Sequence, residues 1–142
     1  MDKDALFQKF VGFTTAVHEI TNELTKDVKS DSITPVQYKI LEYIAISQPV
    51  TLSEISECMH MSMPNMSREL RKLSEKQLCT KVTDDEDRRK QMIQLSEAGQ
   101  AMMGEAFQRI QARFDERIKD ASEEELKEIE LALDLLHNKV FY

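Results

Sequence analysis

The chain has 142 residues, of which 41% are hydrophobic and 32% charged, and its formal net charge is −7. This length suits one compact domain, or one domain with an extension for dimerisation. Three glycines and three prolines disfavour a glycine-rich phosphate-binding enzyme and a turn-rich all-β fold. Two cysteines do not make a disulfide framework, so we expect reduced thiols and a cytoplasmic protein. We expect no signal peptide, and no apolar run approaches the roughly eighteen residues of a membrane span.

The first segment predicts a long amphipathic helix over about residues 4–29. Its apolar residues recur at steps of three and four, which places them on one helix face. They are Leu6, Phe10, Phe13, Val17, Ile20, Leu24 and Val28. A second helix is predicted to begin at Thr34, with Gln37 completing a capping box, and to end before Pro49.

Two short helices are predicted next. The first begins at a capping box of Thr51 and Glu54, and the second is capped by Ser62. We expect the apolar stripe of this second helix to face the core; it comprises Met63, Met66, Leu70 and Leu73. Two short helices joined by about two residues are typical of a helix-turn-helix.

After Leu78 the hydrophobic period becomes that of strands. Residues 79–83 and 91–95 predict two short strands, joined by the charged loop 84–90. A hairpin directly after a helix-turn-helix forms a winged helix. The last third is again helical, and the expected fold class is therefore mainly α, a winged helix-turn-helix with a small β-hairpin wing and long terminal dimerisation helices.

Both ends of the chain carry long apolar stripes that the small central segment cannot cover. We therefore expect them to be buried against a second copy in a symmetric homodimer. The alternative is a monomeric bundle in which the first and last helices cover each other. The expected organisation is an N-terminal dimerisation helix (1–33), a winged-helix core (34–100) and C-terminal dimerisation helices (101–142).

The charge is unevenly distributed along the chain. Residues 62–90 hold eight basic and six acidic residues, a net of +2, whereas residues 1–61 have a net of −4 and residues 91–142 a net of −5. Chance variation on a solvated surface explains such a segment as well as a binding site does, when charge is taken alone.

The helix after Ser62 occupies the position of a recognition helix, which presents its N-terminal residues to the major groove. Arginine pairs with guanine, asparagine with adenine, and serine with bases or phosphate. The face opposite the apolar stripe and its flanks give the predicted DNA-binding residues Ser62, Asn65, Ser67, Arg68, Arg71 and Lys72. The alternative is an exposed amphipathic helix whose polar face binds nothing.

The loop between the two strands adds Arg88 and Arg89 to the predicted DNA-binding residues. Guanidinium groups at a hairpin tip suit a narrow minor groove. The neighbouring carboxylates repel phosphate, and we expect Asp84 or Asp87 to pair with one of the arginines and hold it in place.

Four stretches carry a resemblance to a known family: residues 34–37, 52–56, 65–73, and the wing 84–89 with the following 93–99. Residues 34–104 resemble the winged-helix core of the MarR family of bacterial transcription regulators, and the flanking helices extend this over nearly the whole chain. The resemblance implies a homodimer with interdigitated terminal helices that binds a pseudo-palindromic operator in double-stranded DNA and usually represses nearby genes.

The sequence departs from the family pattern at two positions. Gln77 stands where the family often has glycine, so we expect a looser or differently shaped turn there. Glu86 stands where the wing often carries a basic residue, which weakens the predicted wing contacts.

The resemblance also implies a small phenolic or anionic effector, with Phe13, Val17, Tyr38 and Tyr43 as candidate ligand-binding residues. Residues at such helical spacing are more often plain core. The soft donors from Cys58 to Met63 do not favour a metal site, and no cofactor is expected. We expect Cys58 to be buried and Cys79 to lie on a strand, both as inert thiols.

The sequence predicts no enzyme, because it has three separated histidines, no glycine-rich loop and no nucleophile paired with a base. The leading hypothesis is a sequence-specific transcriptional regulator, a homodimeric repressor released by a small ligand. The alternative is a winged-helix adaptor that binds proteins and not DNA.

Overall fold

The computed structural model describes residues 1–27, 32–83, 86–87 and 91–142. Helices and a small sheet make up this part of the chain. In chain order the elements are α1 (Lys3–Leu24), α2 (Pro35–Ser47), β1 (Val50–Thr51), α3 (Leu52–Cys58), α4 (Met63–Glu75), β2 (Cys79–Thr83), β3 (Gln91–Leu95), α5 (Glu97–Arg117) and α6 (Glu123–Lys139).

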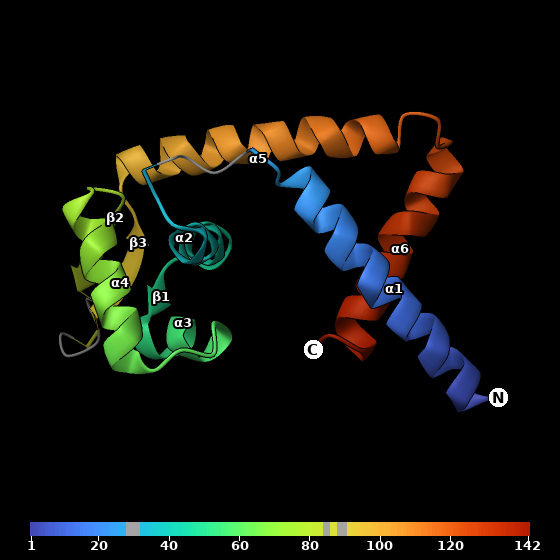
Figure 1. Cartoon of the computed structure of the whole chain (residues 1–142), viewed down its shortest axis with the longest axis horizontal. Coiled ribbons are helices and arrows are strands. Elements are labelled where there is room, and N and C mark those ends of the chain that lie inside the picture. Colours follow the sequence, from blue (N-terminus) through green and yellow to red (C-terminus); the bar gives the residue numbers. More distant parts are fainter. Residues whose placement is uncertain (28–31, 84–85, 88–90) are drawn as a thin grey trace.

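Helix α5 is a long helix that connects two separate parts of the molecule (Figure 1). Elements α2 to β3 lie below one end of α5 and form the winged helix. Helices α1 and α6 lie below its other end, where they cross. The predicted fold class is confirmed, and β2 and β3 have the predicted bounds. The predicted boundary between residues 100 and 101 falls inside α5, which is continuous there.

The sheet has the antiparallel order β1-β3-β2. In the hairpin, Cys79 pairs with Leu95 and Lys81 with Ile93. Strand β1 was not predicted: it has only two residues, and Val50 pairs with Ile93 from far along the chain. A pairing that depends on a distant partner leaves no local periodicity in the sequence.

The side chains that cap the helices follow most of the predictions. Capping boxes are formed by Thr34 with Gln37 and by Ser122 with Glu125. At Thr51 the box is incomplete, because its hydroxyl donates to Glu54 Oε1 at 3.0 Å while also accepting from the Glu54 backbone N–H at 3.1 Å. Helix α1 is shorter than predicted and ends at Leu24; the predicted apolar Val28 lies outside the described residues.

Among the described residues, the buried core lies in the winged helix and the adjoining half of α5. Its fully buried side chains are Ile40, Leu41, Ile44, Val50, Ile55, Met66, Leu73 and Met103. The prediction that Met63 faces this core is wrong: its exposed fraction is 48%, because it is the first residue of α4 and the buried face begins at Met66.

The turn after α4 is closed and not loose as expected. Gln77 adopts the left-handed conformation, with φ 62°, that glycine favours at helix ends. The N–H of Leu78 donates to the Leu73 carbonyl at 3.0 Å, and the Ser96 hydroxyl donates to the Gln77 carbonyl at 2.5 Å. These bonds hold the turn in shape although the residue is not glycine.

Helix α5 approaches this same turn very closely at Gly99. A Cβ atom at Gly99 would lie 2.0 Å from the backbone oxygen of Leu78, which also accepts the Ser96 N–H at 3.0 Å. Only a residue without a side chain permits this contact. The position of α5 on the winged helix therefore depends on Gly99.

We predict that Gly99→Ala lowers the free energy of unfolding by about 1–3 kcal/mol, since α5 must shift away from Leu78. The matched control is Gly104→Ala on the same helix, where a Cβ meets nothing within 4 Å. The control should raise stability by about 0.5–1 kcal/mol through its better helix propensity. Urea unfolding followed by circular dichroism measures both; a Gly99→Ala protein as stable as its parent contradicts this account.

Candidate nucleic-acid interface

Helix α4 presents two chemically different faces. Met66, Leu70 and Leu73 are buried, with exposed fractions of 0%, 3% and 0%. The helical period therefore turns Asn65, Arg68 and Lys72 outward, and all three are exposed. The predicted set is brought together on one helix, with Ser62 and Arg71 also exposed and Ser67 half-buried.

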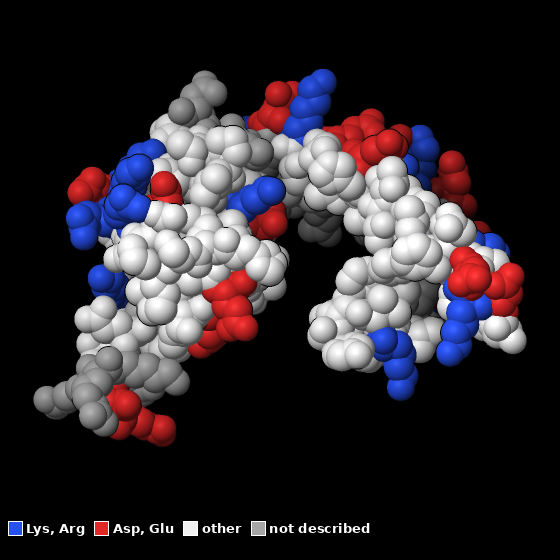
Figure 2. Space-filling model, turned by 60° about the horizontal axis from the view of Figure 1, so that its bottom comes forward, with Lys and Arg blue, Asp and Glu red and all other residues white. Residues whose placement is uncertain are grey.

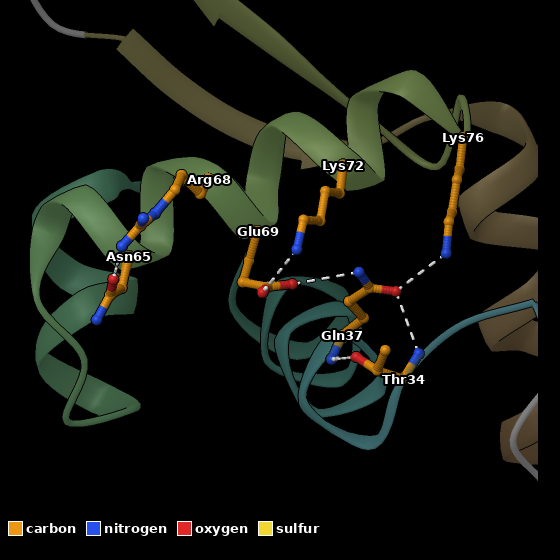
Figure 3. Close-up of polar contacts among 7 residues, drawn as sticks. All are labelled: Thr34, Gln37, Asn65, Arg68, Glu69, Lys72 and Lys76. Carbon is orange, nitrogen blue, oxygen red and sulfur yellow. Dashed lines mark hydrogen bonds and ion pairs between the residues drawn. The ribbon is translucent and has the colours of Figure 1, made fainter.

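The first turns of α4 hold the two residues best suited to reading bases. The Ser62 hydroxyl caps the helix by accepting the Asn65 backbone N–H at 3.2 Å. The Arg68 guanidinium donates to the Asn65 side-chain oxygen, so the two exposed groups lie against each other (Figure 3). Asn65 and Arg68 thus form a joint donor and acceptor surface at the end of the helix that a helix-turn-helix presents to DNA.

Lys72 lies further along the same face. Its ammonium group is 3.6 Å from Glu69 Oε1, and 59% of its side chain is exposed. A surface ion pair of this kind contributes about 0–1 kcal/mol and is screened by salt. Lys72 therefore keeps its charge available to solvent while Glu69 limits its range of positions.

A cleft of about 310 Å³ separates α4 from the hairpin. Ser67 and Arg71 line one wall, and Lys81 and Gln91 line the other. Lys81 is a residue that the sequence prediction did not assign to the site. The only signal for it in the sequence is its place in the basic segment.

The predicted wing contacts involve the tip of the hairpin. Arg88, Arg89 and Asp84 lie outside the described residues. Their contact with a minor groove, and the expected pairing of an arginine with Asp84 or Asp87, therefore stay predictions.

Charged side chains are distributed unequally over the surface (Figure 2). Basic side chains gather on one side of the winged helix, whereas acidic side chains lie on its inward side and are interspersed with basic ones over the rest of the molecule. A net charge of −7 thus does not describe the local surface on which an anion would bind.

The four candidate ligand-binding residues occupy two separate places. Phe13 and Val17 are exposed on α1 and line a hollow of about 510 Å³ beside α6. Tyr38 is buried in α2, and Tyr43 packs half-buried against the same core. Burial raises the pKa of Tyr38 to about 12, with a smaller contribution from the Glu42 carboxylate. Within one chain, the two tyrosines have the environment of core residues.

The two cysteines differ in their surroundings. The expectation of a buried Cys58 is wrong: it is the last residue of α3 and is exposed. Cys79 is buried on β2, and burial raises the pKa of its thiol. In the described ranges, no group of three or more His, Cys, Asp or Glu side chains is placed to hold a metal ion. None of the helices described is long and apolar enough to cross a membrane.

Helices α2, α3 and α4 with the antiparallel hairpin that follows define a winged-helix protein. Residues 33–90 match the model of the MarR family, which confirms the resemblance seen in the sequence. This match supports a DNA-binding transcription regulator.

Similar proteins cover nearly the whole chain. It is 25% identical over 137 residues to the HTH-type transcriptional regulator MhqR of Bacillus subtilis (strain 168), covering 92% of this chain and 94% of the relative. A MarR family protein from Bacillus stearothermophilus has the same fold, with a TM-score of 0.77 and 21% identity over 100% of this chain and 99% of that one. Staphylococcus aureus MarR in complex with salicylate and kanamycin has a TM-score of 0.72 and 24% identity, over 96% and 93% of the two chains.

Proposed function

We propose that this chain is a cytoplasmic, homodimeric repressor that recognises a pseudo-palindromic operator and is released from it by a small ligand. The observation that carries the proposal is the exposed Asn65–Arg68 pair on α4, whose opposite face is fixed in the core. Arginine and asparagine are the side chains that bind guanine and adenine through two hydrogen bonds each.

The proposed division of roles follows from position on α4. Asn65 and Arg68 read base edges near the N-terminus of the helix, with Ser62 beside them. Ser67, Arg71 and Lys72 bind phosphates on either side, and Lys81 joins them from the wing. Arg88 and Arg89 extend the contact to the minor groove in this proposal.

The proposed homodimer is supported by the apolar side chains that α1 and α6 leave exposed in the single chain. Neither α1 nor α6 contains a buried residue, although Phe10 and Phe141 stack with ring centroids 5.8 Å apart. Large apolar side chains remain exposed on both helices, among them Phe7 (59%), Leu133 (57%) and Leu135 (61%). Contact between the two helices within one chain therefore leaves their apolar surface in water, which disfavours the monomeric alternative.

The ligand is proposed to be a small phenolic or anionic compound. Its support is the salicylate in the S. aureus MarR structure of the same fold, since salicylate is a phenolic anion. The hollow lined by Phe13 and Val17 is the apolar candidate site in this chain. Adding salicylate to the protein–DNA complex and following its dissociation tests this part of the proposal.

We predict that Arg68→Ala lowers the affinity for the preferred duplex by at least about 30-fold, because a homodimer loses one bidentate base contact, of about 1–3 kcal/mol, in each half-site. The preferred duplex is obtained by letting the parent protein select from a randomised pool. Affinity for an unrelated duplex should change by less than about threefold, since most phosphate contacts remain.

Arg109→Ala is the matched control. Arg109 is an exposed arginine on α5, paired with Glu105 at 3.1 Å and distant in sequence from the candidate interface. It should bind both duplexes like the parent. If Arg68→Ala retains the parent's affinity for the selected duplex, the DNA-reading role of α4 fails. Binding that does not weaken with salt contradicts the phosphate contacts, and failure to enrich any duplex favours the protein-binding adaptor.

The dimer makes a separate prediction. The parent should have twice the mass of the 16.5 kDa chain in light scattering at micromolar concentration. Leu133→Glu should shift it toward the monomer, because it introduces a charge on the apolar face of α6. Ile46→Glu is the control: Ile46 is 73% exposed on α2, outside the terminal helices, and its substitution should leave the dimer intact. A monomeric parent contradicts the proposal.

A further inference from the structure

Gln37 is a buried polar residue of α2, with an exposed fraction of 3%. Its side-chain oxygen accepts two hydrogen bonds, from the Thr34 backbone N–H at 3.1 Å and from the Lys76 ammonium at 3.1 Å. Its side-chain nitrogen donates to Glu69 Oε2 at 3.2 Å. Figure 3 shows this amide lying between the start of α2 and the facing side of α4.

The two partners of the Gln37 side chain, Glu69 and Lys76, each make a further contact. The other oxygen of Glu69 is 3.6 Å from the Lys72 ammonium, and Lys76 also donates to the backbone carbonyl of Ser32, just before α2. Glu69 and Lys76 are seven residues apart, which is about two turns of helix. One amide on α2 therefore contacts α4 at Glu69 and at its C-cap residue Lys76.

These polar contacts restrict the orientation of α4 in a way that packing of the apolar core does not. Met66, Leu70 and Leu73 bury the inner face of α4, but apolar burial has no preferred direction. Hydrogen bonds require short distances and near-linear angles, so they restrict rotation and sliding of the helix. A small rotation of α4 displaces Arg68, which lies next to Glu69 in the chain, relative to the base it would contact.

We propose that Gln37 is a positioning residue that sets the orientation in which α4 presents Asn65 and Arg68 to DNA, and that it acts through Glu69. This inference rests on the proposed function. The chemistry requires an amide, because one group must accept from Thr34 and Lys76 while it donates to Glu69.

The test exploits this requirement. Gln37→Glu keeps an oxygen for Thr34 and Lys76 but replaces the donor to Glu69 by a second carboxylate, so only the link to Glu69 is broken. The double variant Gln37→Glu/Glu69→Gln restores the hydrogen bond with donor and acceptor exchanged and conserves the net charge. Glu69→Gln alone still offers an oxygen to the Gln37 amide.

The measured quantity is the ratio of affinities for the selected duplex and a scrambled duplex, at a temperature where circular dichroism shows each variant folded. We predict that Gln37→Glu lowers this ratio by about tenfold, as loss of a buried hydrogen bond and a like-charge contact imply. The double variant and Glu69→Gln should stay within about threefold of the parent. Gln108→Glu, the same change at an exposed position of α5, should leave the ratio unchanged.

A purely structural role of Gln37 lowers the melting temperature without changing the ratio, and that result overturns the inference. A folded double variant with the low ratio of Gln37→Glu also overturns it. If Gln37→Glu does not fold, Glu69→Met takes its place, because it removes the acceptor and leaves the cap of α2 intact; an unchanged ratio then refutes the role of Glu69. If the parent itself prefers no duplex, the proposed function has failed and not this inference alone.

Discussion

Helix α4 buries Met66, Leu70 and Leu73 in the core of the winged helix, and this packing determines which of its side chains face outward. Full burial of each such side chain contributes about 1.5–3 kcal/mol, whereas a typical hydrogen bond contributes about 0.5–1.5 kcal/mol net. The apolar face therefore dictates the coarse position of the helix, and the polar contacts of Gln37 refine it. The apolar packing and the Gln37 contacts together position the exposed Asn65 and Arg68. The candidate DNA-binding surface therefore depends on side chains that are not part of it.

One half of the molecule buries its own apolar side chains, and the other half leaves them exposed in the single chain. The winged helix contains the core, and Gly99 lets α5 pack directly on the backbone at Leu78. Helices α1 and α6 have no buried residue in the single chain. The continuous α5 joins both halves, so a second copy on the terminal helices would fix the distance between two winged helices (Figure 1). A symmetric pair of this kind matches a pseudo-palindromic operator, because the two-fold axes of protein and DNA coincide.

Local signals in the sequence predicted most of this architecture. The predicted caps Thr34 and Ser62 depend on residues three positions away, and both form. The short strand β1 was missed because Val50 pairs with the distant Ile93. The exposure of Cys58 at the end of α3 and the place of Lys81 in the cleft beside α4 were not predicted either. For the candidate site, helical periodicity placed Asn65, Arg68 and Lys72 outside correctly, but it gave no sign that Gln37 contacts Glu69, thirty-two residues further along the chain. The turn at Gln77 was expected to be looser or differently shaped than one with glycine, but Gln77 adopts the left-handed conformation and backbone hydrogen bonds close the turn.

In the complex that we propose, the outer face of α4 lies in a major groove at each of two half-sites. Dimethyl sulfate protection on the duplex selected by the full chain tests it most directly, because the reagent methylates guanine N7 in the major groove and adenine N3 in the minor groove. We expect protected guanine N7 atoms in two clusters whose centres are about one helical turn, or 10–10.5 base pairs, apart. Protection confined to adenine N3, or no protection at saturating protein, would contradict it.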